Sequence, residues 1–238
     1  MTGLISDSTI SLGNMLRWRC MPSAYQESRR FLFPLHLINV LLFVTWWCWP
    51  WNWPVLLGLF IFFLALTFFI AYFFRDPERV VPPDEKIIVS AADGLVVGVE
   101  EMDETDFKLG RMRRISVFLS VFDVHVNRAP VAGRVLKTIY KPGEFLDVRH
   151  PESSMRNECL SWSLETAQGP VVVRQIAGLI ARRIVAWSKE GDTLTRGYRF
   201  GMIRFGSRTE VFLPLECSVL VKPGDRVAGA SSPIARWP

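Results

Sequence analysis

A glycine and a serine near the C-terminus, Gly206 and Ser207, are a pair that could do chemistry on the chain itself. They lie in RFGSRT (204–209), between apolar segments that end at Phe205 and begin at Val211. Such a pair ordinarily predicts a turn or a strand end. Alternatively, it is a place where the chain breaks itself to make a catalyst, because surrounding structure can hold backbone strain there. The GxSxG elbow of many serine hydrolases is absent from the sequence, so a conventional serine nucleophile lacks its usual support.

A histidine that could serve as a base lies in SVFDVHVNRAP (120–130). Asp123 and His125 are two residues apart, so on a strand their side chains face the same side. A lone histidine on an apolar strand is more often structural. The other two histidines are less suited to act as a base, because His36 lies in an apolar run and His150 lies in a polar stretch that predicts a loop. His125 is therefore the candidate base.

An aspartate in SAADGLVVG (90–98) is the third candidate. Asp93 and the glycine after it predict a turn that enters a strand. If Asp93 meets His125 in space, its carboxylate would orient the imidazole and stabilise the charged form of the ring. The four cysteines form no CxxC pair and histidines are few, so we expect neither a disulfide framework nor a metal site.

Two apolar runs precede these candidates, at residues 31–49 and 55–74, and each is long enough to span a bilayer core. Residues 50–54, PWNWP, separate them with turn residues and interfacial tryptophans. Arginines flank the outer ends of both runs and the connection has none. This pattern predicts a membrane hairpin with both termini cytoplasmic and a cytoplasmic segment over residues 1–30.

Two alternatives to a spanning hairpin remain. The runs could form a buried helical pair in a soluble protein, although residues 55–74 carry no charge on any face. The first run is the weaker span, because Pro34, His36 and Asn39 lie near its start, and a shallow or re-entrant segment would also accommodate them.

Residues 75–238 differ from the hairpin in composition and predict a mostly β (α+β) domain. After a linker rich in proline and charge, short β-branched runs alternate with turns, and sustained helical periodicity is absent. Two turns resemble each other, KEGDTLTRG (189–197) and KPGDRVAGA (222–230). Similar Gly-Asp turns occur in lipoyl and biotinyl carrier domains, so we expect a barrel-sandwich-like arrangement.

The motifs together resemble the phosphatidylserine decarboxylases, in their short bacterial and archaeal form. The matching stretches keep their order and spacing over roughly residues 70–230: FRDPER, AADG, FDVHVNRAP, YKPGEF, RFGS and KPGD. The set is far more specific than any one member. An apolar N-terminal region also occurs in such enzymes.

The resemblance implies a pyruvoyl-dependent enzyme that cleaves itself between Gly206 and Ser207. The Ser207 hydroxyl would attack the Gly206 carbonyl, and elimination and hydrolysis would leave a pyruvoyl group on an α chain of residues 207–238, with residues 1–206 as the β chain. That group would form a Schiff base with phosphatidylserine, release CO₂ and give phosphatidylethanolamine. No metal and no diffusible cofactor would be needed.

The resemblance also implies roles for individual residues. Asp93 and His125 would serve self-cleavage, and whether His125 also serves decarboxylation is left open. Longer members carry a second histidine where this chain has Arg128, which leaves one histidine for both tasks or gives Arg128 an electrostatic role. The substrate phosphate needs cationic or amide donors. Arginine clusters that could supply them, or be solvated surface charge, are Arg182 and Arg183, and Arg111, Arg113 and Arg114.

A net charge of +5 and a pI near 9.2 suit an anionic membrane surface. We expect phosphatidylserine, the bilayer and the two chains of one precursor as partners, at the cytoplasmic face of the inner membrane. A homo-oligomer is left open, and no nucleic acid is expected. The rival hypotheses are a non-catalytic membrane-anchored adaptor, a serine hydrolase acting on lipids, and a pyruvoyl decarboxylase for another amino-acid head group.

Overall fold

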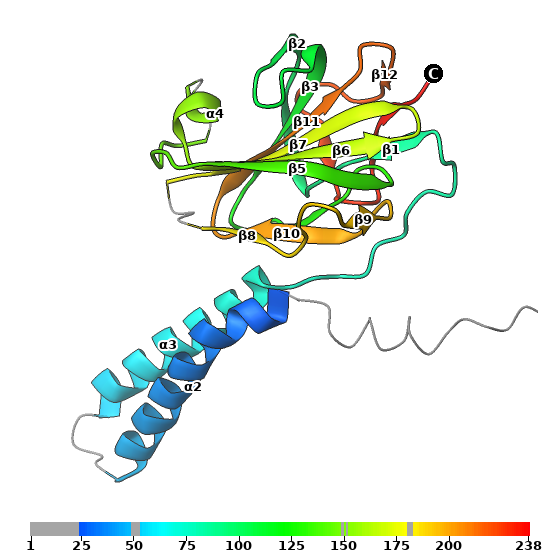
Figure 1. The fold of residues 1–238 in the computed structure, drawn as a ribbon. Helices are drawn as coiled ribbons and strands as arrows, with labels where there is room; N and C mark the ends of the chain where they lie inside the picture. The colour runs from blue at the N-terminus through cyan, green and yellow to red at the C-terminus, as the bar shows by residue number, and fades with distance from the viewer. Residues whose placement is uncertain (1–23, 49–52, 149, 151, 180–182) are drawn as a thin grey trace, which may run out of the picture.

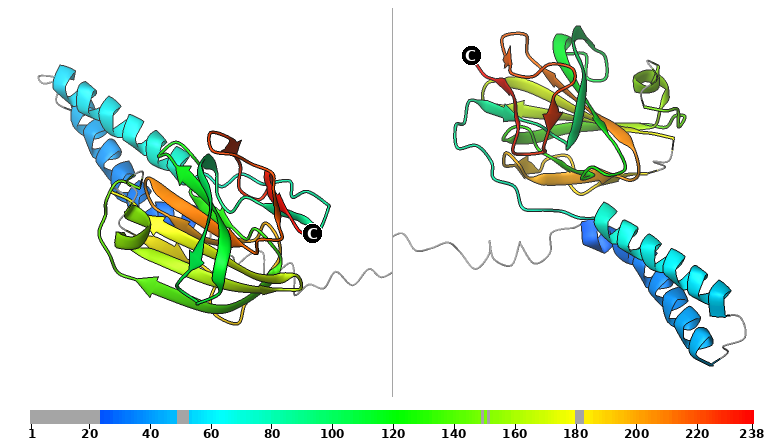
Figure 2. Two further views of the ribbon diagram at one scale, coloured as in Figure 1. Left: turned by 90° about the horizontal axis from the view of Figure 1, so that it is seen from above. Right: turned by 180° about the vertical axis from the view of Figure 1, so that it is seen from behind.

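The chain folds as a pair of long helices joined to a β domain (Figure 1). The computed structural model describes residues 24–48, 53–148, 150, 152–179 and 183–238. The views in Figure 2 agree that the helical pair projects from one end of the β domain. The expectation of a mostly β domain after two N-terminal apolar helices is confirmed.

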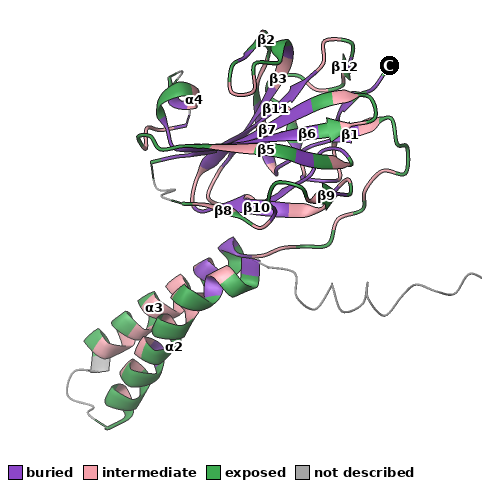
Figure 3. Cartoon of the chain, in the orientation of Figure 1, coloured by how far each residue is buried: buried purple, intermediate pink, exposed green. Residues whose placement is uncertain are grey.

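The helices α2 (Ala24–Cys48) and α3 (Trp53–Phe73) lie side by side. Both are apolar and long enough to cross a membrane, and their surfaces are largely exposed, as Figure 3 shows. Asn39 Nδ2 donates to Thr67 Oγ1 at 3.0 Å, so a polar bond joins the two helices. These features are those of a hairpin whose outer surface needs an apolar surrounding.

Helix α2 starts at Ala24, earlier than the expected boundary at Phe31, and continues through Pro34 without a break. The segment 24–30, AYQESRR, is rich in helix formers, and Glu27 in the first turn suits the positive end of the helix dipole. Part of the expected N-terminal segment is therefore helix, and residues 1–23 lie outside the described part.

The β domain is built on an eight-stranded antiparallel sheet in the order β13-β2-β3-β11-β7-β6-β5-β9. Two three-stranded sheets, β1-β14-β12 and β4-β10-β8, accompany it. The strands are β1 (Ile87–Val89), β2 (Gly94–Glu104), β3 (Gly110–Leu119), β4 (Val126–Arg128), β5 (Gly133–Lys141), β6 (Cys159–Thr166), β7 (Gly169–Ala177), β8 (Ile184–Ala186), β9 (Thr193–Leu194), β10 (Arg199–Ile203), β11 (Ser207–Leu213), β12 (Ser218–Val219), β13 (Arg226–Val227) and β14 (Pro233–Arg236). A single helical turn, α4 (Ser153–Arg156), lies between β5 and β6.

The large sheet curls into a half-barrel around the main core. Side chains alternate between the two faces of the sheet along β11. Val211 and Leu213 pack in the main core with Trp162, whereas Phe212 packs on the opposite face with Met112. Because side chains alternate strictly, Ser207 at the start of β11 lies on the core side.

The two Gly-Asp turns stand at opposite edges of this sheet, before β9 and β13. In each turn the aspartate carboxylate accepts the lysine N–H at 2.9 Å, Asp192 from Lys189 and Asp225 from Lys222. Each middle glycine has positive φ and donates to a bulged strand next to the edge strand, Gly191 to Val135 of β5 and Gly224 to Val96 of β2. The similarity seen in the sequence is therefore a structural one.

The segment that follows α3 is fastened to the β domain by ion pairs. Asp76 binds Arg128 at 2.7 Å and Arg199 at 2.6 Å through its two carboxylate oxygens. Arg79 pairs with Asp93 at 2.5 Å. The charges of the FRDPER stretch therefore fix the hairpin to the domain.

Candidate functional site

The candidate cleavage pair forms a tight turn between β10 and β11. Phe205 and Gly206 both have left-handed backbone conformations, with φ of +61° and +60°. Glycine adopts this conformation freely, but an aromatic residue held there costs about 1–3 kcal/mol. Strain is therefore concentrated on the peptide units directly before Ser207.

The Ser207 hydroxyl is fully buried, and none of the described residues makes a hydrogen bond with it. The backbone of Ser207 pairs with Leu119 of β3 and with Ala177 of β7, so the residue starts a central strand of the sheet. A buried hydroxyl without a partner ordinarily destabilises a fold. Such a group is free to act as a nucleophile on a neighbouring carbonyl.

The Gly206 carbonyl passes very close to Gly178, just after β7. A Cβ placed on Gly178 would lie 2.4 Å from the Gly206 oxygen and 2.9 Å from Val148 Cγ1. Those distances are far below van der Waals contact. Any side chain at position 178 would displace the Gly206 carbonyl.

His125 contacts the same turn from the segment before β4. Its Nε2 accepts the Gly206 N–H at 3.2 Å, and its Nδ1 lies 2.9 Å from the Asp123 carbonyl oxygen. A carbonyl only accepts, so the proton sits on Nδ1 and Nε2 carries the free lone pair. The imidazole is thereby held in the tautomer that a general base requires.

Burial keeps this imidazole neutral. His125 is fully buried, and the ring of Phe73 lies 4.3 Å from it, centroid to centroid. Burial lowers the pKa of His125 from its usual 6.5 to about 4, since the charged form loses its hydration. At neutral pH the ring is therefore unprotonated and able to accept a proton.

Asp93 lies elsewhere and does not orient His125 in this structure. One carboxylate oxygen of Asp93 pairs with Arg79, and the other accepts the Gly229 N–H at 2.8 Å. The Nδ1 of His125 is taken by the backbone of Asp123. Asp93 instead ties the segment after α3 to the turn before β14.

Arg128 is not available to a substrate. Its guanidinium donates to Asp76 at 2.7 Å and to the Pro77 carbonyl at 2.9 Å, and the residue is buried. The expectation that Arg128 assists substrate binding is therefore not supported by its position. The guanidinium of Arg128 instead serves as the buried cationic partner of the Asp76 carboxylate in the RDPER stretch.

The remaining candidate arginines are dispersed. Arg183 is exposed just before β8, and Arg182 lies outside the described residues. On β3, Arg113 pairs with Glu101, and Arg114 pairs with both Glu100 and the buried Glu210. These β3 arginines are neutralised within the sheet.

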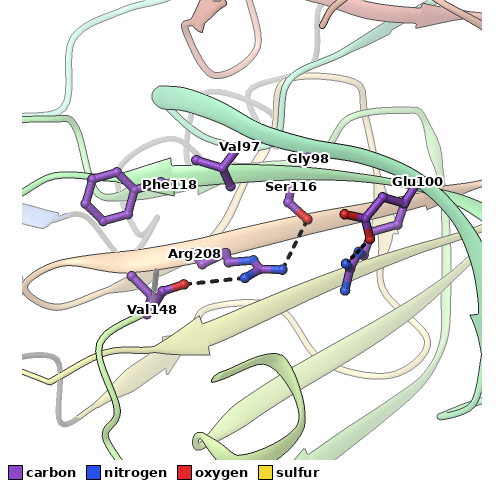
Figure 4. Close-up of a pocket in the computed structure, with 8 residues that line it drawn as sticks. Val97, Gly98, Glu100, Ser116, Phe118, Val148 and Arg208 are labelled. Carbon is purple, nitrogen blue, oxygen red and sulfur yellow. Dashed lines mark hydrogen bonds and ion pairs between the residues drawn. The ribbon is translucent and has the colours of Figure 1, made fainter. Parts of the chain in front are cut away.

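A cavity of about 400 Å³ opens on the face of the sheet opposite Ser207 (Figure 4). Arg208 lies across it, donating to the Val148 carbonyl at 3.4 Å and pairing with Glu210 at 2.7 Å. Arg114 and Glu100, which also line the cavity, form a second pair. The cavity is polar, but both guanidinium groups that line it face carboxylates.

Several contributors were absent from the sequence-based prediction. In the sequence, Phe73 is one residue of an apolar run, and nothing distinguishes Gly178 from the other glycines. Asn127 also escaped notice, although its amide donates to Thr209 Oγ1 at 3.2 Å and so holds β4 against β11 beside Ser207. The asparagine inside HVNR was the one visible signal, since a polar side chain in an apolar strand needs a partner.

Comparison with known proteins gives one consistent result. Residues 66–235 match the family model described as phosphatidylserine decarboxylase. This range covers the end of α3 and nearly all of the β domain.

Curated relatives named phosphatidylserine decarboxylase proenzyme are similar over the same region. The protein of Geobacter metallireducens is 50% identical over 179 residues, which are 74% of this chain and 81% of the relative. That of Symbiobacterium thermophilum is 50% identical over 73% of this chain and 81% of its own length. That of Geotalea uraniireducens is 50% identical, with 74% and 82% covered.

Proposed function

Because the chain belongs to the phosphatidylserine decarboxylase family, we propose that it is a membrane-anchored proenzyme that cleaves itself at Gly206–Ser207 and decarboxylates phosphatidylserine. One observation carries the self-cleavage: a buried Ser207 hydroxyl, without a partner among the described residues, follows a left-handed glycine whose N–H is bound by the free nitrogen of His125. The proposed nucleophile and scissile carbonyl thus lie in one turn, and a neutral base contacts that turn.

The first step is an acyl shift. Ser207 Oγ attacks the Gly206 carbonyl carbon while His125 Nε2 takes the hydroxyl proton. The bond from the Gly206 N–H to Nε2 opens as the hydroxyl approaches. The protonated imidazole then returns its proton to the departing Ser207 nitrogen, so the amide becomes an ester.

The second step separates the chains. Removal of the Ser207 Cα proton expels the Gly206 carboxylate, and the dehydroalanine left behind takes up water and releases ammonia. Cleavage leaves β11 in place, since Ser207 to Phe212 pair with β3 on one side and β7 on the other. The new N-terminus therefore stays fixed in the middle of the sheet.

The pyruvoyl group supplies an electrophilic carbonyl for the substrate amine and an electron-withdrawing group for the loss of CO₂. The surroundings of residue 207 fit such a group, because the hydroxyl it would replace is buried and has no partner among the described side chains.

We propose that α2 and α3 span the inner membrane, with the β domain on the cytoplasmic side. Arg29, Arg30 and Arg75 flank the ends of the helices next to the domain, whereas tryptophans gather at the far end. The arrangement would hold the catalytic turn near the head groups of a bilayer-bound substrate.

Intact mass of the purified full chain tests the proposal. The wild type should give two chains divided at Gly206/Ser207, with the smaller one resistant to N-terminal sequencing. Ser207→Ala should remain one chain. An active wild-type preparation that stays whole would overturn the self-cleavage.

The substrate is tested separately with detergent-mixed phosphatidylserine. Processed protein should convert it to phosphatidylethanolamine, with one CO₂ released for each product, and Ser207→Ala should not. Processed protein that leaves phosphatidylserine intact while decarboxylating another amino-acid head group would overturn the substrate assignment alone.

A further inference from the structure

The domain-side end of the hairpin packs directly against the cleavage turn. The ring of Phe73 stacks on Phe205 with centroids 4.4 Å apart and lies 4.3 Å from the His125 ring. Phe31 and Phe74 contact Phe205 edge-on, at 6.3 and 6.5 Å. Figure 3 shows buried residues at this end of the hairpin, beside the β domain.

An ion pair joins the hairpin to the same turn. Glu27, in the first turn of α2, binds the guanidinium of Arg204, which directly precedes Phe205. Both side chains are mostly buried, and the guanidinium also lies 5.7 Å from the centre of the Phe31 ring. A mostly buried pair of this kind fixes geometry, because separating the partners would leave an unpaired charge.

The hairpin also contacts the segment that carries His125, the proposed base. Arg75, directly after α3, donates to the Phe122 carbonyl at 2.6 Å, and the Phe69 ring packs against Phe122 at 6.5 Å. Phe122 directly precedes Asp123, whose carbonyl orients His125. The same helix end therefore contacts the base segment and the nucleophile turn, which come from distant parts of the sequence.

From these contacts we propose that the hairpin is part of the self-processing apparatus, with Phe73 and Glu27 as positioning residues that hold Phe205–Gly206 in register with His125. The inference rests on the proposed self-cleavage. It goes beyond anchoring, since a tether alone would need no contact with the turn. Phe205 keeps its left-handed conformation because aromatic rings from both helices surround it.

Two kinds of variant of the full chain, purified in detergent, test the aromatic contact. Phe73→Ala should slow processing by roughly tenfold or more, because small misplacements of reacting groups are costly. Phe62→Ala, on the exposed side of α3, is the matched control and should process at the wild-type rate. Phe73→Leu keeps an apolar cover and should recover part of the rate.

The pH profile separates positioning from a general loss of structure. Without the Phe73 ring, water reaches His125 and its pKa moves back toward 6.5. Processing of Phe73→Ala should then decline as pH falls below that value, whereas the wild type holds its rate. A slower variant with an unchanged profile would contradict the positioning of His125.

The ion pair gives an independent test that does not depend on a core substitution. Glu27→Arg and Arg204→Glu should each slow processing, and the double exchange should restore it. A double variant as slow as the singles would overturn the role of the pair. Wild-type chain that never cleaves would refute the proposed function, whereas cleaving wild type together with fully active Phe73→Ala would refute this inference only.

Discussion

The backbone N–H of Gly206 donates to Nε2 of His125 across 3.2 Å, and this bond joins the scissile residue to its candidate base. The histidine comes from the segment before β4 and the glycine from the turn before β11. The Asp123 carbonyl on Nδ1 fixes which nitrogen is free. In the proposed precursor, the lone pair of His125 Nε2 is thus occupied by a weak donor that can be released.

Replacing the base should block self-cleavage without disturbing the turn. In His125→Gln the amide oxygen can accept the Gly206 N–H but cannot take up a proton, so processing should fall by about 100-fold or more. The wild-type rate should stay level from pH 8 to about 5 and decline below, because the pKa of His125 is about 4. Intact mass against time measures both.

His150→Gln is the matched control, because His150 lies in an exposed loop and its ring accepts the Glu152 N–H. It should process like the wild type. Normal processing in His125→Gln would remove His125 from the reaction.

The buried imidazole should also make stability depend on pH. Its folded pKa of about 4 lies below the usual 6.5, so the unfolded chain binds the extra proton between these values. The contribution is complete above pH 6.5 and is lost as pH falls toward 4. A shift of that size corresponds to about 3 kcal/mol of unfolding free energy.

Thermal unfolding of Ser207→Ala, with and without His125→Gln, measures this contribution on an uncleaved chain. The melting temperature should fall more steeply between pH 6.5 and 4 when His125 is present. Glu158, whose pKa is raised by burial, acts in the opposite sense and cancels in the comparison. Parallel curves would show that the imidazole is not held neutral.

Much of the architecture could be predicted because it follows from local pattern. The short β-branched runs became strands, the apolar runs became α2 and α3, and the two Gly-Asp turns proved alike. Gly206, Ser207 and His125 were identifiable as candidates from residue type and motif order, and they meet in one turn.

The rest could not be predicted, since it depends on tertiary contacts without a local signature. The partner of His125 Nδ1 is a backbone carbonyl, which every residue possesses, so a carboxylate was the more natural expectation. From the sequence, Arg128 was a candidate to replace a catalytic histidine. Its ion pair with Asp76 depends instead on how the segment after α3 packs against the domain. Phe73 is an ordinary apolar residue until the fold brings it onto the turn.

The Arg79–Asp93 pair should behave as one energetic unit. The two side chains are partly buried, with exposed fractions of 18% and 16%. Arg79→Gln and Asp93→Asn, in the Ser207→Ala chain, should each cost about 1–3 kcal/mol, and the double variant should cost less than their sum. Chemical unfolding gives the four free energies. Strict additivity would mean that the two residues act independently.

The close approach of Gly178 to the Gly206 carbonyl gives the sharpest steric prediction. Gly178→Ala would place a methyl group 2.4 Å from that oxygen, so the carbonyl must turn away from Ser207 Oγ. Self-cleavage should slow by about 100-fold. Gly133→Ala is the matched control, because its methyl group would meet the Glu165 carbonyl at 2.6 Å on the far edge of the sheet.

The two alanine variants should lose similar stability in the Ser207→Ala chain, since both press against a backbone oxygen. Only Gly178→Ala should accumulate as uncleaved precursor when Ser207 is present. Hydroxylamine then locates the block, because it cleaves an ester and spares an amide. Gly178→Ala precursor that hydroxylamine cuts at Gly206 would show that the acyl shift still occurs, and the steric argument for that step would be wrong.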